Sequence, residues 1–194
     1  MFFVGGDYVY PRTTNAYAIE VAKDLGFTIL EEEYTDMSTK DYTPVIRRIM
    51  EEKPDLLIVT NPGAAGVSFM RQALQFELNK EMVIGGFATF DQEAIEAMGN
   101  ASEGVYVVNR YSKFLKNDEN DKFLRLYSDR YPNEDLMPGP TAAAGSFGSI
   151  MLAAKAFNLA QSDELVDFRN KINGLEMTLP QGQVKVNPNN QIFE

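Results

Sequence analysis

Two tyrosines near the start of the chain have the residue types and spacing of a small-molecule site. Tyr8 and Tyr10 follow the pair Gly5-Gly6 in the stretch VGGDYVYPRTTNA at 4–16. Glycine permits a sharp turn and a close approach of the backbone to a ligand, and a phenol offers both an aromatic face and a hydroxyl group. Two interpretations are open: at least one tyrosine lines a pocket, or both are packing groups, one buried and one on the surface.

A second turn carries short polar groups. The stretch TNPGAAG at 60–66 contains Thr60, Asn61 and Gly63. A helix that begins after this turn would attract a carboxylate to its N-terminus, so an amino acid ligand is compatible with it. The alternative is that Asn-Pro-Gly is ordinary turn chemistry without a ligand.

A third candidate is the stretch GGFATFDQE at 85–93, where Thr89 follows the end of an apolar run. Phe87 or Phe90 could wall a cleft here, although an aromatic residue in this position is more often part of the core. We expect Asp91 to cap a following helix rather than to bind an ammonium group.

The composition excludes several kinds of site. The 194 residues include neither Cys nor His, which removes thiol nucleophiles, Cys/His zinc sites and histidine-based catalytic triads. A net charge of −10 disfavours nucleic acid as a partner, since phosphate binding depends on Lys and Arg. The chain also has no G-x-G-x-x-G, P-loop or G-x-S-x-G motif. We therefore expect a protein that binds and does not catalyse, with no cofactor and no metal.

The elements that must position these residues are short apolar runs alternating with segments of helical period. We expect five strands and four helices in the first half, the fourth helix being a short one after Asp91. The strands are at 2–5, 27–34, 55–60, 82–87 and 104–108; the longer helices are at 13–25, with Thr13 or Thr14 as its cap, 41–53 and 66–79. This alternation predicts an α/β fold with a doubly wound parallel sheet, in which ligands bind at the carboxyl ends of the strands.

The pattern changes in the second half of the chain. We expect helices at 118–131, from Thr141 to 161 and at 163–173, and a strand in QVKV at 183–186. The run NEDLMPGP at 133–140 is expected to be a link, and IFE at 192–194 to begin another strand. No stretch has the pattern of a signal peptide or the length of a membrane span.

Four stretches together resemble the C-terminal portion of type I periplasmic ligand-binding proteins. They are VGGDYVYPRTTNA, EEEYTDMSTKDYTPVIRRIMEEKPDLLIVTN, EGVYVV and LPQGQVKVNPNNQ, in the same order and at similar spacings. The most similar group is the urea and short-chain amide receptors and the related amide-sensing regulator, within the branched-chain amino acid receptor family. The resemblance also gives a reason for ends that look cut, because the first lobe of a two-lobed clamp would be missing.

The resemblance implies a division of the chain. Residues 1–110 would be the C-terminal ligand-binding lobe, 111–162 the crossover and helices that pack on the missing N-terminal lobe, and 163–194 a return helix and closing strand. In the relatives the tyrosines after the first strand and the turn after the third strand contact the ligand. Arg110 and Tyr111 would lie at the hinge, where Arg110 could face the cleft or form a solvated or interlobe ion pair.

The implied function is the substrate-binding component of an ABC transporter for urea, a short-chain amide or a branched-chain amino acid. The implied partners are a small-molecule ligand and an ABC permease, and the parent family is periplasmic or extracellular. Alternatives are a cytoplasmic amide-sensing regulator with a regulatory partner protein, and an isolated flavodoxin-like domain. Helices at 118–161 could also expose an apolar face and pair two chains.

Overall fold

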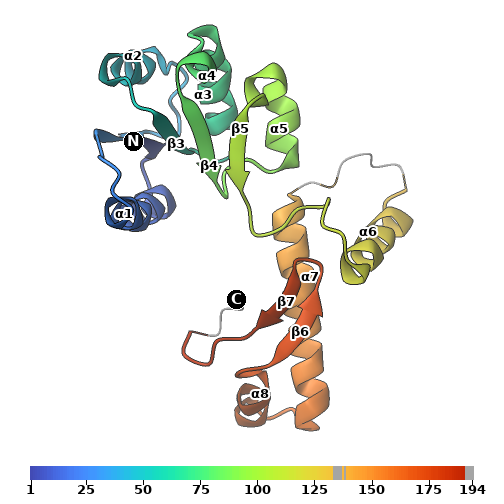
Figure 1. The fold of residues 1–194 in the computed structure, drawn as a ribbon. Coiled ribbons are helices and arrows are strands. Elements are labelled where there is room, and N and C mark those ends of the chain that lie inside the picture. Colours follow the sequence, from blue (N-terminus) through green and yellow to red (C-terminus); the bar gives the residue numbers. More distant parts are fainter. Residues whose placement is uncertain (133–136, 138, 191–194) are drawn as a thin grey trace. The chain divides into compact units, whose positions relative to one another are not determined.

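The computed structural model describes residues 1–132, 137 and 139–190, and the chain divides into two compact units (Figure 1). The first unit is Met1–Asn109 and the second is Arg110–Glu194. No helix in the described ranges is both long enough and apolar enough to cross a membrane.

The first unit is built on a parallel sheet of five strands, which confirms the predicted fold class. The strand order is β2-β1-β3-β4-β5, and every neighbouring pair is parallel. The strands are β1 (Phe2–Gly6), β2 (Glu31–Thr35), β3 (Leu56–Thr60), β4 (Val83–Phe87) and β5 (Val105–Val108). Parallel strands cannot be joined by tight hairpins, so each connection crosses over through a helix.

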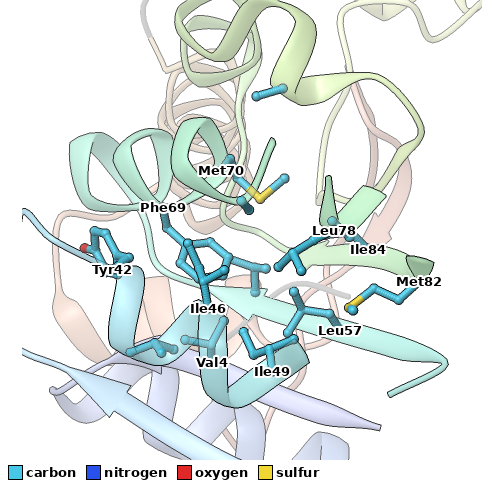
Figure 2. Packing of buried hydrophobic residues seen from close by; sticks show 14 of the residues in the cluster. Val4, Tyr42, Ile46, Ile49, Leu57, Phe69, Met70, Leu78, Met82 and Ile84 are labelled. Atoms are coloured by element: carbon cyan, nitrogen blue, oxygen red, sulfur yellow. The ribbon is translucent and has the colours of Figure 1, made fainter. Parts of the chain in front are cut away.

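The crossover segments contain α1 (Val9–Asp24), α2 (Thr43–Glu52), α3 (Gly63–Gln75), α4 (Leu78–Glu81) and α5 (Gln92–Met98), followed by the 3₁₀ turn η1 (Gly99–Ser102). Successive residues of a strand point to opposite faces of the sheet. Phe2 and Val4 therefore enter the main core with α2, α3, α4 and α5, whereas Phe3 packs against Ile19 of α1 on the other face. Figure 2 shows the main core, where Ile46 of α2 and Phe69 of α3 lie over the strands.

Several predicted boundaries were wrong. Helix α1 begins at Val9 rather than at residue 13, so Tyr8 occupies the N-cap position and neither Thr13 nor Thr14 caps the helix. Strand β2 begins only at Glu31. The predicted helix at 66–79 begins three residues earlier, and a left-handed residue, Glu77, separates α3 from α4.

The second unit contains three helices and one hairpin among its described residues. They are α6 (Asp118–Arg130), α7 (Pro140–Ala160), α8 (Leu165–Ile172), β6 (Glu176–Leu179) and β7 (Gly182–Lys185), the two strands being antiparallel. A Cβ at Gly148 of α7 would lie 2.8 Å from the Leu179 side chain, so glycine is what allows the hairpin to pack closely on the helix. The sequence did not predict β6, because EMTL lacks a distinctive apolar pattern.

The structure places α8 and the β6–β7 hairpin in the second unit together with α6 and α7. The assignment of 111–162 and 163–194 to different lobes of a clamp stays a prediction. Residues 133–136, 138 and 192–194, on which the predicted link and the predicted IFE strand partly or wholly fall, lie outside the described residues.

Candidate ligand-binding site

The order of the strands defines where the first unit can bind a ligand. The chain runs from β1 outward to β2 and then returns past β1 to β3, so β1 and β3 flank the point where the winding reverses. Helices leave opposite faces of the sheet at such a point, and the backbone turns that diverge there leave a crevice at the carboxyl ends of the strands. Tyr8 follows the end of β1, and Asn61 follows the end of β3.

The two tyrosines lie side by side at this edge. Their ring centroids are 6.2 Å apart and the ring planes are tilted by 39°. Both side chains are partly exposed, whereas Val9 between them points to solvent. Because Tyr8 is the last extended residue before α1 and Tyr10 belongs to its first turn, the change of backbone direction at the helix start turns both rings toward one another.

Tyr10 also connects two turns of the sheet edge. Its hydroxyl donates a 2.7 Å hydrogen bond to the backbone carbonyl of Phe87 at the end of β4. The Thr89 hydroxyl donates to the same oxygen at 2.8 Å. Strand β3 lies between β1 and β4, so Tyr10 reaches past one whole strand to bring the predicted residues Tyr10 and Thr89 together. The hydroxyl groups of both residues are thereby used inside the protein.

The Tyr8 hydroxyl is the phenol that remains available. Among the described residues it makes no hydrogen bond, and partial burial together with the neighbouring Tyr10 raises its pKa. The group therefore stays neutral and can donate or accept a hydrogen bond.

Sequence reasoning missed Met37, which belongs to this edge. A Cβ built on Gly6 would lie 2.7 Å from the Met37 sulfur and 3.2 Å from the Tyr8 ring. Both side chains therefore close over the Gly6 backbone, and Met37 is half-exposed there. The signal in the sequence is weak, because Met37 comes from the turn after β2 and only the fold brings it beside Tyr8.

A polar network holds the turn after β1. Arg12 donates a 2.7 Å hydrogen bond to Asp7, and its guanidinium lies 4.2 Å from the centre of the Tyr34 ring. Tyr34 donates in turn to Glu32. Burial and that hydrogen bond raise the pKa of Tyr34 to about 12. The hydrogen bond to Asp7 and the stacking of its guanidinium on the neutral Tyr34 ring hold Arg12 in place. Arg12 thereby ties the Tyr8 turn to the end of β2.

The turn after β3 contains two buried residues and one open one. The Thr60 hydroxyl lies 3.2 Å from Val4 O and 3.1 Å from Asn15 Oδ1 and can donate its one proton to either of them. This predicted ligand contact therefore links β3 to β1 and α1. Asn61 is fully buried. Gly63, by contrast, is exposed at the first position of α3, and a Cβ there would meet nothing within 4 Å.

Other aromatic and hinge residues fall elsewhere. Phe90 is fully buried in the main core, and Phe87 packs on the α1 side of the sheet, in agreement with the expectation that these rings belong to the core. Arg110 is exposed and begins the second unit. Tyr111 is buried, and its hydroxyl donates to Asn120 at 2.7 Å within the second unit.

Within the described ranges no group of three or more Asp and Glu side chains has the arrangement of a metal site. The edge instead offers a pair of phenol rings, a thioether and exposed backbone at a helix N-terminus. These are groups that recognise a small organic molecule by shape and hydrogen bonding.

A family model described as "Periplasmic binding protein" matches residues 1–194, the whole chain. The chain belongs to the periplasmic binding protein family. This confirms the resemblance that the sequence motifs indicated.

Solved structures agree on the fold. An ABC transporter substrate-binding protein from Sphaerobacter thermophilus superposes with a TM-score of 0.92 at 18% identity, over 100% of this chain and 53% of that one. A leucine binding protein from Thermotoga maritima gives 0.83 at 20% identity, over 98% and 54%. A solute binding protein of an ABC transporter from Rhodopseudomonas palustris, in complex with 3,4-dihydroxybenzoic acid, gives 0.84 at 23% identity, over 99% and 53%. The chain therefore spans about half the length of the structures it matches.

Proposed function

We propose that this chain is the ligand-binding portion of the substrate-binding component of an ABC transporter for a small polar nitrogenous solute. Urea, a short-chain amide or a branched-chain amino acid is the proposed ligand class. The proposal includes an ABC permease as the partner and a location outside the cytoplasmic membrane. Membership of the periplasmic binding protein family supports it. In the proposal the chain binds and releases its solute and catalyses no reaction.

One observation carries the choice of site: Tyr8 and Tyr10 lie together at the strand edge where the sheet reverses its winding. In the proposal the Tyr8 hydroxyl hydrogen-bonds the polar edge of the solute and the two rings cover its flat face. Tyr10 and Thr89 hold the turns after β1 and β4 in place through their shared acceptor at Phe87.

The remaining predicted residues take different roles in this proposal. Thr60 is fully buried and supports the edge from inside through its hydroxyl, which lies within hydrogen-bond distance of Val4 O and Asn15 Oδ1. Asn61 is also fully buried, neither atom of its side-chain amide has a hydrogen-bond partner among the described residues, and it stays a predicted contact. The exposed start of α3 at Gly63 supplies backbone N–H groups to a carbonyl or carboxylate oxygen of the solute. Arg110, at the start of the second unit, stays a predicted contact.

A thermal-shift panel tests the proposal on the chain as it exists. Urea at concentrations well below denaturing, acetamide, leucine, isoleucine and benzoate are each added to the wild type and to Tyr8→Phe. We expect a nitrogenous solute to raise the melting midpoint, because a ligand that binds only the folded state stabilises it, and we expect the rise to shrink in Tyr8→Phe. A rise with benzoate alone would reject the proposed solute class.

A further inference from the structure

Met37 lies beside the Tyr8 turn, although it comes from a different connection of the sheet. Strands β1 and β2 pair in parallel with Gly6 opposite Thr35, and the Asp7 N–H donates a 2.8 Å hydrogen bond to the Thr35 carbonyl. The turn that follows β2 is therefore held against the turn that follows β1.

The backbone at Met37 is fixed by its own turn. The Thr39 N–H donates to the Asp36 carbonyl at 2.9 Å, which closes a four-residue turn with Met37 in its second position. The Asp36 carboxylate accepts from the N–H of Ser38 at 2.8 Å and from the Ser38 hydroxyl. Met37 is thus carried on a formed turn, while its flexible side chain can adjust to what it packs against.

The Met37 thioether lies close to the hydroxyl end of the Tyr8 ring. A Cβ on Gly6 would lie 2.7 Å from the Met37 sulfur and 3.2 Å from Tyr8 Cε1, the ring carbon next to the one that bears the hydroxyl. Met37 is 47% exposed, so about half of its apolar surface is open at the edge. A solute held by the Tyr8 hydroxyl can therefore reach the thioether.

The polar side chains near this thioether have partners within the protein. The Tyr10 hydroxyl donates to the Phe87 carbonyl, and the Asp7 carboxylate accepts a 2.7 Å hydrogen bond from Arg12. The Asp36 carboxylate is bound to Ser38. This part of the edge thus offers two aromatic rings and a thioether around the available Tyr8 hydroxyl.

We propose that Met37 is a specificity-determining residue of the solute site, because its thioether packs against an apolar group of the solute while the Tyr8 hydroxyl binds the polar end. The inference rests on the proposed function and narrows its solute class. A molecule with one polar end and one alkyl end satisfies both side chains. Urea has hydrogen-bonding groups on every side and would place one of them against the thioether without a partner, which costs free energy.

Two homologous series measured by isothermal titration calorimetry test this proposal. The first series is acetamide, propionamide and butyramide, the second is alanine, 2-aminobutyrate and norvaline, and urea is measured beside them. In the wild type we expect the dissociation constant of at least one series to fall by roughly fourfold for each added CH₂, the worth of burying that group. Urea should bind more weakly than any member of that series.

Three variants assign the rise in affinity to Met37. Met37→Gln keeps the length of the side chain but makes its end polar, and the gain per CH₂ should shrink to less than about twofold. Met37→Leu stays apolar and should retain most of the gain. Met50→Gln is the matched control, because Met50 is 41% exposed on α2, away from the edge, and the series should be unchanged in it. The gain per CH₂ is the readout because a general loss of stability would weaken all members alike.

Circular dichroism establishes that each variant is folded. If no solute in either series and no urea binds to the folded wild type, the proposed function fails and this inference fails with it. If solutes bind, three results would overturn the inference alone: affinity that does not rise along either series, a full rise retained in Met37→Gln, or an equal loss of the rise in Met50→Gln.

Discussion

The Tyr10 hydroxyl donates a 2.7 Å hydrogen bond to the backbone carbonyl of Phe87, seventy-seven residues further along the chain. This bond joins the turn after β1 to the end of β4 across the position of β3. It also distinguishes the two tyrosines, since the Tyr10 hydroxyl is hydrogen-bonded within the first unit, whereas the Tyr8 hydroxyl is the one proposed to bind the solute.

The first prediction is that the two tyrosines respond differently to loss of the hydroxyl group. Tyr10→Phe should lower the free energy of unfolding by about 0.5–1.5 kcal/mol, the net worth of one hydrogen bond. The effect should fall at the low end, because Thr89 still donates to the Phe87 carbonyl. Tyr8→Phe should leave stability nearly unchanged. Urea denaturation measures both, and equal losses in the two variants would contradict this division of roles.

The second prediction concerns the Thr60 hydroxyl inside the lobe. Thr60→Val keeps the shape but leaves the Val4 carbonyl and Asn15 Oδ1 without this donor. A buried acceptor left unpaired costs about 1–3 kcal/mol of stability. Thr60→Ser is the control, since it retains the donor, and it should be closer to the wild type in chemical denaturation. If Thr60→Val were as stable as the wild type, the hydroxyl would have no structural role.

The third prediction uses the glycine pair before the site. A Cβ at Gly5 would lie 2.7 Å from Thr60 Oγ1 and 2.9 Å from Pro11 Cβ, both held by packing. Gly5→Ala should therefore destabilise the fold by about 1–3 kcal/mol, as overpacking does. Gly145→Ala in α7 is the control: its Cβ meets nothing within 4 Å, and it should stabilise by about 0.5–1 kcal/mol. The melting midpoints of the two variants should move in opposite directions.

Gly6→Ala is a separate test of the site. Its Cβ would displace the flexible Met37 side chain and the Tyr8 ring, with closest approaches of 2.7 Å and 3.2 Å. We expect the fold to survive and solute affinity to fall several-fold, because the two groups that close over Gly6 must move. Titration calorimetry measures the affinity. If Gly6→Ala bound the solute with unchanged affinity, neither Met37 nor the Tyr8 ring atoms beside Gly6 would belong to the binding site.

The fourth prediction is a loss of stability at alkaline pH. Burial raises the pKa of Tyr111 to about 12, and burial with the Glu32 hydrogen bond raises that of Tyr34 to about 12. In the unfolded chain both titrate near the ordinary value of 10. Above pH 10 the unfolded state loses these protons first, so the free energy of unfolding falls as the pH rises from 10 to about 12 and is undiminished below 10.

Ultraviolet difference titration of the folded chain should show these two phenols ionising after the exposed ones. Tyr111→Phe should make the alkaline loss of stability shallower. If the free energy of unfolding fell with pH as steeply in Tyr111→Phe as in the wild type, the buried Tyr111 phenol would not contribute to the alkaline loss of stability.

Much of the sheet could be predicted from the sequence, because buried parallel strands are continuous apolar runs. LLIVT in β3 and VIGGF in β4 were expected to within one residue. The start of β2 could not be predicted, because the mostly apolar residues at 27–30 lie outside the sheet, whereas the charged segment EEEYT forms the strand. Charged side chains are tolerated there because β2 is an edge strand with a half-exposed face.

The arrangement of the candidate site could be predicted only in part, because its residues are held by partners from distant segments of the chain. The Gly-Gly-Asp-Tyr-x-Tyr pattern indicated the edge, but the partner of Tyr10 is a backbone carbonyl, which no side-chain motif reveals. The inward direction of Thr60 depends on the approach of Asn15 from α1. Met37 lies beside Gly6 and Tyr8 only because β1 and β2 pair in parallel and end side by side.

The measurement that tests the account most directly is isothermal titration calorimetry of the wild type and Tyr8→Phe with the solute that gives the largest thermal shift. The account predicts saturable binding of one urea-, amide- or amino acid-type molecule per chain, and an affinity that falls by roughly 10-fold in Tyr8→Phe, the worth of one hydrogen bond. A folded wild type that binds none of these solutes, or a Tyr8→Phe variant that binds as tightly as the wild type, would contradict it.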